Sequence, residues 1–245
     1  MACGALALPA TGWASPGGGV GFGSGGSGIG SGNGSSTTTH ETPAVQSGNV
    51  SVSVSGNGVT LQTDASAMLR RNATFSGTAP SRFAGDTVVI QRSGHETHWR
   101  WVSTVSAPIQ SDGSFAAVWH ANHIGRFSIR ALIASGTVAQ SANATPSLTV
   151  TVYRPSLATQ YGPGFYGHRT ACGVRLRKST IGVANRTLPC GTDVAVYFRG
   201  RTMTVPVIDR GPYANHADWD LTTATGRALG ITGSAKIGAV SLPIR

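Results

Sequence analysis

The sequence predicts an all-β protein with a flexible N-terminal segment, a two-sheet β-sandwich and a small closed β-barrel. Short alternating segments separated by turn residues recur from residue 49 onward, which is typical of all-β domains. Only one short stretch has the start and stop signals of a helix. A Gly- and Ser-rich run precedes the first predicted strand. The 245 residues therefore divide into a linker and two compact units.

The segment 16–48 is too poor in apolar residues to fold. Eleven of the 34 glycines lie between Gly17 and Gly34, and we interpret 16–48 as a flexible linker. Residues 1–15 are apolar, small and end in an Ala-Ser step, typical of the second half of a secretion signal whose basic beginning is missing. The alternative is a chance apolar N-terminus. The sequence contains no run of 18 apolar residues that would span a membrane.

The segment 49–154 predicts a sandwich of about seven antiparallel strands. It resembles the immunoglobulin-like modules of secreted bacterial proteins in its pattern rather than in any motif. A turn signal at Ser111–Ser114 separates two of the strands. The role expected for this domain is that of a spacer or a wall-anchoring module. The expected strands are 50–55, 72–76, 86–92, 99–103, 114–119, 125–130 and 147–152.

The histidines and tryptophans of this domain are interpreted as structural residues. The pairs in His95–His98 and His120–His123 lack the helical spacing of a zinc motif, so we expect solvated loops or strand edges and no metal site. Trp99, Trp101 and Trp119 fit either packing or a platform for sugars. Packing in the core or on a sheet face is the favoured reading.

The last ninety residues predict a small barrel with one helix. The helix runs over Ala224–Leu229, with Thr222 or Thr223 as its N-cap and Gly230 as its end. The loop before it contains Asp220. The expected strands are 158–161, 181–183, 193–198, 202–208 and 235–242.

The charge balance predicts an anionic partner. The chain has 19 Lys and Arg against nine acids, and eleven of these cations but only four Asp lie in 157–245. Nucleic acid is disfavoured, because the basic residues are scattered and no nucleic-acid motif is present. The remaining candidates for the anionic partner are a membrane surface and an acidic cell-wall polymer.

One stretch, Val205–Tyr213, runs an apolar strand directly into a charged turn. Asp209 stands where the strand ends, a position that holds a catalytic carboxylate on a rigid support in many folds. The structural alternative is a turn clamp in which Asp209 pairs with Arg210 or with backbone amides.

The cysteines favour an oxidising compartment. Cys3 lies in the predicted signal segment, which leaves Cys172 and Cys190 as an isolated pair. Their spacing fits neither a CxxC redox motif nor a zinc site. A disulfide is the leading interpretation, and two free buried thiols are the alternative.

Four separated motifs carry a family resemblance over about 157–245. Tyr161–Gly173, Arg186–Thr192, Val207–Tyr213 and Trp219–Thr222 are similar in order and spacing to the rare lipoprotein A (RlpA) family. That family is built on the six-stranded double-psi β-barrel, which expansins and barwin share. The upstream half of the chain is not covered by the resemblance.

The resemblance implies a lytic transglycosylase that cleaves peptidoglycan between N-acetylmuramic acid and N-acetylglucosamine with formation of a 1,6-anhydro end. Asp209 matches the catalytic aspartate of the family. No metal or organic cofactor is implied, and we expect a monomer that is peripheral to the cell wall. The resemblance strengthens the disulfide reading, because Cys172 and Cys190 lie in two of the motifs. The expected substrate contacts are Tyr161, Tyr166, Asn185, Arg210, Tyr213, Trp219 and Asp220.

Two positions depart from the family pattern. Val174 stands where many members have Glu, and Asn185 stands where a His is frequent. Valine carries no proton and a neutral amide does not titrate. Either Asp209 acts alone, or the domain binds glycan without cutting it, as an expansin-like wall-loosening module. His168 is a weaker substitute acid or base, and a barwin-like protein-interaction module is a third reading.

Overall fold

The structure is a computed structural model that describes residues 43–135, 138–139, 144–214 and 216–243. All of these residues belong to one compact unit, 41–245. The predicted signal segment 1–15 and the predicted linker as far as residue 42 lie outside the described residues. Within the described part of the chain, no helix has the length and apolar character needed to cross a membrane.

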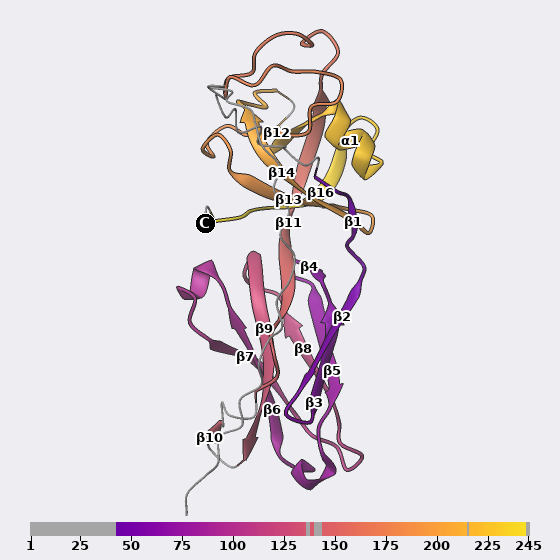
Figure 1. The fold of residues 1–245 in the computed structure, drawn as a ribbon, viewed down its shortest axis with the longest axis vertical. Coiled ribbons are helices and arrows are strands. Elements are labelled where there is room, and N and C mark those ends of the chain that lie inside the picture. Colours follow the sequence, from indigo (N-terminus) through magenta and orange to yellow (C-terminus); the bar gives the residue numbers. More distant parts are fainter. Residues whose placement is uncertain (1–42, 136–137, 140–143, 215, 244–245) are drawn as a thin grey trace, which may run out of the picture. The chain divides into compact units, whose positions relative to one another are not determined.

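The first half of the described chain is a two-sheet β-sandwich (Figure 1). One sheet has the order β2 (Ser51–Gly56), β3 (Val59–Asp64), β5 (Asn72–Thr78) and β8 (Ser114–His120). The other has the order β7 (Val102–Pro108), β6 (Thr87–Ser93), β9 (Gly125–Ser135) and β11 (Leu148–Tyr161). The short strands β4 (Ser66–Met68) and β10 (Val138–Ala139) pair with β11 and β9. The 3-10 helices are η1 (Ser81–Phe83) and η2 (His95–Thr97).

The core of the sandwich lies between these two sheets. Phe75 and Trp119 come from the first sheet and Ile90, Phe127 and Ile129 from the second, and all five are buried. The rings of Trp119 and Phe127 meet edge to face with centroids 6.1 Å apart. Trp119 is therefore a packing residue, as predicted, and the alternation along β8 and β9 results from burial of one face of each sheet.

The second half is a closed barrel of six strands (β11 in pink-red and the other five in orange to yellow in Figure 1). The order is β15-β12-β14-β13-β16-β11, and β15 also pairs with β11, which closes the ring. The pairs β12–β14 and β11–β15 are parallel, whereas the other pairs are antiparallel. The new elements are β12 (Val183–Ala184), β13 (Asp193–Phe198), β14 (Arg201–Asp209), β15 (Trp219–Thr222), β16 (Ala235–Ser241) and α1 (Thr223–Leu229).

One strand, β11, belongs to both sheets. Its first part, from Leu148 to Val152, pairs with β9, and its second part, from Arg154 to Ala158, pairs with β16. The sequence indicated two strands here, separated by a junction at Tyr153–Ser156. The junction is itself extended and hydrogen-bonded, so the strand continues without a break. The strand β1 (Gln46–Ser47), from the end of the predicted linker, pairs with the start of β14.

The predicted helix is present with its predicted caps. The Thr222 side chain accepts a hydrogen bond from the Thr225 N–H at 3.2 Å, and Gly230 ends the helix with a φ of 77°.

Two predictions about the extent of strands were wrong. Asp220 lies on β15 rather than on a loop, because the four-residue strand runs directly into the cap of α1. The strand expected at 99–103 begins only at Val102, because His98 and Trp99 have left-handed φ angles of 52° and 60°.

The barrel core predicts a large cost for truncating Leu221, which is fully buried on β15. We expect Leu221→Ala to lower the free energy of unfolding by about 2–5 kcal/mol, because a cavity replaces a well-packed side chain. Urea denaturation followed by near-UV circular dichroism measures this loss. Val174→Ala, at a position 37% exposed, is the control and should change stability by less than about 1 kcal/mol. Equal effects of the two substitutions would contradict the described core.

Candidate active site

Asp209 and Asp220 lie in one row across three neighbouring strands. Ala184 of β12 is paired with Asp209 of β14 on one side and with Asp220 of β15 on the other. The register shifts between Val183 and Ala184, and this bulge brings Asp209 opposite Ala184. Strands are spaced by about 4.8 Å, so the two aspartates are roughly 10 Å apart at their backbones. Ala184 therefore separates the two aspartates in the strand pairing.

The Asp209 carboxylate is held by backbone amides. The N–H groups of Ala171 and Arg210 donate to its Oδ1 at 2.9 and 2.8 Å. The Arg210 guanidinium instead donates to the Asn185 carbonyl at 3.4 Å and contacts the Cys190 sulfur at 3.3 Å. Arg210 thus fixes the turn through backbone contacts. Both backbone N–H groups donate to Oδ1 of Asp209, so neither of these two hydrogen bonds involves Oδ2.

A disulfide fixes the loop that supplies the Ala171 amide. Cys172 and Cys190 are bonded, with their Cα atoms 5.7 Å apart, which confirms the predicted bridge. Within the loop, the Thr170 N–H donates to the Val174 carbonyl at 2.8 Å. The bridge closes a sequence separation of 18 residues and contributes about 3 kcal/mol in the chain-entropy account. It also ties the Ala171 loop to the turn that contacts Arg210.

Tyr161 is positioned beside both carboxylates. It is paired with Thr222 at the end of β11, and its hydroxyl is buried without a hydrogen bond of good geometry to any described residue. Burial is the largest cause that raises the pKa of Tyr161, and the charges of Asp209 and Asp220 raise it further. The hydroxyl therefore stays protonated and is a donor close to the carboxylates.

Asp220 is the second carboxylate of the site and is partly buried. Its Oδ1 accepts a hydrogen bond from the Thr159 hydroxyl at 2.9 Å. Burial raises the pKa of Asp220 most, the Thr159 hydrogen bond lowers it, and the charge of Asp209 raises it again. The net shift is upward, so Asp220 holds a proton more tightly than a solvated aspartate does.

Two predicted substrate contacts have structural roles instead. The Asn185 side-chain oxygen accepts from the amides of Thr187 and Leu188 at 3.1 and 2.9 Å, which makes a local turn. Its amide nitrogen is the group left to face a ligand. Trp219 is 6% exposed and packs in the barrel core, so its ring is not available to stack on a sugar.

The other predicted residues are spread around the loops. Tyr213 is 80% exposed, and Tyr166 is half-buried with its hydroxyl against Gly162. His168 and Val174 are exposed on the same loop as Ala171.

Sequence reasoning missed three groups that support Asp209 and Asp220. The Ala171 amide is a backbone group and carries no side-chain signal. Thr159 was signalled only by its place two residues before Tyr161, on the same face of a strand. Arg186 donates to the carbonyls of Pro212 and Ala217 at 2.7 and 3.0 Å and so secures the segment after the turn.

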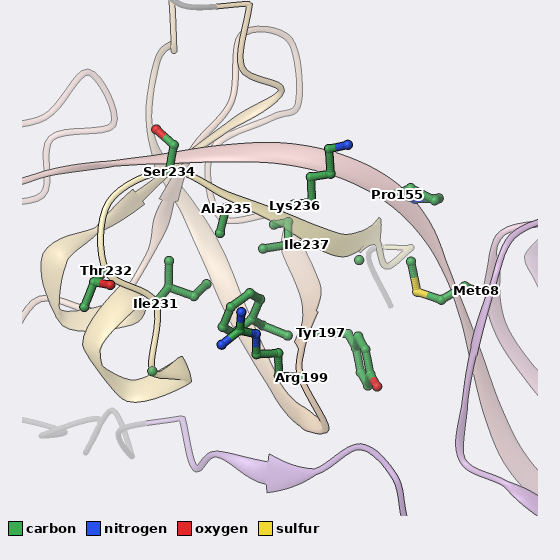
Figure 2. Close-up of a pocket in the computed structure, with 13 residues that line it drawn as sticks. Met68, Pro155, Tyr197, Arg199, Ile231, Thr232, Ser234, Ala235, Lys236 and Ile237 are labelled. Carbon is green, nitrogen blue, oxygen red and sulfur yellow. The ribbon is translucent and has the colours of Figure 1, made fainter.

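A separate hollow of about 490 Å³ lies on the barrel away from these carboxylates (Figure 2). Its lining includes Tyr197, Arg199, Ile231, Lys236 and Ile237 and none of the residues that contact Asp209 or Asp220. The charged ends of Arg199 and Lys236 point away from each other in Figure 2, so these two cations do not face a common point in the hollow. The candidate site is therefore the row of carboxylates and not this hollow.

No cluster of three or more His, Cys, Asp or Glu side chains able to hold a metal ion occurs in the described part of the chain. The groups that the described residues bring to the site are two carboxyl groups, one phenol and the backbone amides around them.

Comparison with known proteins finds a family that matches the barrel. The family described as "Lytic transglycolase" matches residues 157–242. The C-terminal domain is an RlpA-like double-psi β-barrel. The RlpA-like barrel begins on the shared strand β11 and includes every residue of the carboxylate row.

Curated relatives of the RlpA-like barrel are similar over part of their length. A "Probable endolytic peptidoglycan transglycosylase RlpA" of Synechocystis is 38% identical over 47% of this chain and 36% of its own. The "Endolytic peptidoglycan transglycosylase RlpA" of Campylobacter jejuni is 34% identical over 32% of this chain and 29% of its own. The chain thus spans about a third of the length of these relatives. Among solved structures, the Streptomyces papain inhibitor is 26% identical, with 36% of this chain and 93% of its own covered and a TM-score of 0.30.

The raised pKa of Asp220 predicts how stability depends on pH. The folded state holds this proton more tightly than the unfolded chain, so the stability from the group is greatest below about pH 3.8 and is lost as pH rises through the folded pKa. Asparagine stays neutral and keeps an oxygen for Thr159. We therefore expect Asp220→Asn to be more stable than the wild type at neutral pH, with a difference that shrinks on acidification.

Urea denaturation across a pH series measures this difference. Asp193→Asn, which removes an exposed carboxylate from the same barrel, controls for net charge. A gain that grows as pH falls would contradict the assigned direction of the shift.

Proposed function

We propose that the RlpA-like barrel is a peptidoglycan lytic transglycosylase that acts in remodelling of the cell wall at division. It cleaves the β-1,4 bond between N-acetylmuramic acid and N-acetylglucosamine and leaves a 1,6-anhydro-muramyl end. The observation that carries the proposal is Asp209, held through Oδ1 by two backbone amides with a second carboxylate in the same row. The names of the curated relatives support the same chemistry.

The reaction needs one group that gives and then takes a proton. As a carboxylic acid, Asp209 protonates the glycosidic oxygen while the bond from muramyl C1 to that oxygen breaks. As a carboxylate, it then removes the proton of the muramyl C6 hydroxyl, whose oxygen forms the new bond to C1. No water is consumed, and the proton lost by Asp209 in the first step is regained in the second.

The neighbours of Asp209 have supporting roles. Tyr161 stays protonated, so its hydroxyl donates toward a carboxylate or a sugar oxygen without exchanging its proton. Asp220, whose pKa burial raises, is a substrate contact that accepts or donates a hydrogen bond. Arg210 and Asn185 shape the turn, and Tyr213 at the exposed rim is the ring available for sugar stacking.

The departures from the family pattern fit this division of roles. Val174 is 37% exposed and supplies no acid at the position where many members have Glu. Asp220 is the remaining carboxylate in the row of Asp209. The proposal therefore assigns the proton transfers to Asp209 and the polar contacts to Asp220 and Tyr161.

Charge and the disulfide fit an extracytoplasmic place of action. The segment 157–245 has eleven Lys and Arg and four Asp, a surplus suited to a polymer that carries carboxylates. The bridge between Cys172 and Cys190 fits an oxidising compartment. The proposed arrangement is a monomer at the wall, with a glycan-cleaving domain at 157–245 and a separate sandwich at 49–154.

The rival function is a wall-binding module that loosens the polymer without cutting it. Both functions use the same row of residues, but only the enzyme needs Asp209 to exchange a proton. Purified peptidoglycan and analysis of released muropeptides separate the two.

Asp209→Asn is the decisive substitution, because an amide keeps the shape and the hydrogen bonds to the backbone but does not titrate. We expect release of anhydro-muropeptides to fall by about a hundredfold or more, while retention on peptidoglycan persists. Chromatography with mass spectrometry measures the products, and Asp193→Asn is the matched control. Retention of wild-type protein without any soluble product would favour the wall-binding module.

Tyr161→Phe tests the buried phenol. Its ring meets Phe165 edge to face at 6.4 Å, and phenylalanine keeps this contact while removing the hydroxyl. We expect the rate of product release to fall by about tenfold and stability to stay equal or rise, because a buried hydroxyl without a good partner costs free energy. A loss of stability with an unchanged rate would show that the hydroxyl serves the fold only.

A further inference from the structure

Trp99 lies on the surface of the sandwich in a conformation that sterics disfavour. Its side chain is 62% exposed, and both His98 and Trp99 have left-handed φ angles, 52° and 60°. Positive φ is uncommon outside glycine and is an outlier for a bulky residue. A large apolar ring kept exposed on a strained backbone serves neither the core nor the local conformation.

The segment that carries Trp99 is rigidly supported. The Trp99 N–H donates to the Gly94 carbonyl at 2.9 Å, and the Thr97 hydroxyl bonds reciprocally to the Gly94 backbone at 3.0 Å. Arg92 and Glu96 form an ion pair at 2.8 Å across the same turn. The indole is therefore presented with little entropy left to lose on binding.

The sheet beside Trp99 displays cations and hydroxyl groups. Trp99 lines a hollow with Arg126, Ser128 and Thr149 on the outward face of β9 and β11. Residues of the barrel, Asp193 among them, close the other side of this hollow. The sandwich itself adds no free acid there, since the nearby Glu96 is paired with Arg92.

A second ring continues this surface along β9. The Arg130 guanidinium lies 4.2 Å from the centre of the Trp101 ring. Both Nε and Nη2 of Arg130 also donate to the Gln91 side-chain oxygen at 3.0 and 2.9 Å. We call the set Trp99, Trp101, Arg126, Ser128, Arg130 and Thr149 the Trp99 surface.

We propose that the Trp99 surface binds a β-linked polysaccharide that carries carboxylate groups, independently of cleavage at Asp209. The exposed indole packs on the apolar face of a pyranose ring. Arg126 pairs with a carboxylate of the polymer, and Ser128 and Thr149 accept or donate hydrogen bonds to sugar hydroxyls.

The polymer is peptidoglycan, and on this one point the inference rests on the function proposed for the barrel. A surface that binds the polymer beside the cleaving domain raises the effective concentration of substrate at Asp209. The sandwich is then a wall-binding module, which is the second of the two roles expected for it, and not a spacer.

Binding is measured with the full chain carrying Asp209→Asn, so that the polymer is not consumed. In this background we expect Trp99→Gly to weaken retention on purified peptidoglycan by about fivefold to tenfold, and Trp99→Phe to restore most of it. The same Trp99→Gly change should leave the thermal midpoint unchanged or raise it, because glycine adopts the left-handed conformation without strain. Val118→Ala, at a half-exposed position on the opposite sheet, is the control for binding.

Three outcomes overturn the proposal. Unchanged retention of Trp99→Gly shows that the ring does not contact the polymer. A lower thermal midpoint together with weaker retention shows that Trp99 supports the fold and that the loss of binding comes from destabilisation. Loss of binding to a single-stranded oligonucleotide, with peptidoglycan retention intact, shows that the surface recognises a different polyanion. Product release by Trp99→Gly with Asp209 intact tests cleavage by the barrel separately. Failure of the binding proposed for the Trp99 surface is therefore distinguishable from failure of the function proposed for the barrel.

Discussion

The parallel pairing of β12 with β14 is the constraint on which the candidate site depends. It aligns Ala184 with Asp209, and the antiparallel pairing of β12 with β15 aligns the same alanine with Asp220. The two aspartates are therefore paired on either side of the same alanine. The closing contact of β15 with β11 then pairs Thr159 with Asp220 and places Tyr161 two residues further along β11. Closure of the barrel and assembly of the site are thus one event.

The surrounding loops contribute backbone groups and not charges. Asp209 takes its hydrogen bonds from the amides of Ala171 and Arg210, while the Arg210 guanidinium turns back to the Asn185 carbonyl. These two amides orient the Asp209 carboxylate, and the disulfide at Cys172 holds the loop that supplies the Ala171 amide.

Much of the fold was predictable because its signals are local. The caps Thr222 and Gly230 define α1, and alternation defines most strands. The barrel followed from motif order, and the disulfide from two cysteines in those motifs. The strand β3 was missed and β15 was interpreted as a loop. A short alternating stretch beside a turn or a helix cap is compatible with either a strand or a loop.

The site was only partly predictable from the sequence. Asp209 and Tyr161 stood in recognisable motifs, whereas the Ala171 amide is a backbone donor that depends on where a loop folds back. Trp219 was expected at the groove, yet alternation along β15 turns it into the core, opposite to Asp220. Trp99 was expected to pack. Its exposure follows from the left-handed backbone at His98 and Trp99, and these residue types do not predict that conformation.

The central claim is that one aspartate drives an intramolecular displacement, and the origin of the oxygen in the product tests it most directly. Peptidoglycan is digested in water enriched in the heavy oxygen isotope, and the mass of each new muramyl end is measured. Attack by the C6 hydroxyl predicts ends that carry no solvent oxygen. Incorporation of one heavy oxygen at each cleaved bond would contradict the account and would indicate hydrolysis by the two carboxylates Asp209 and Asp220.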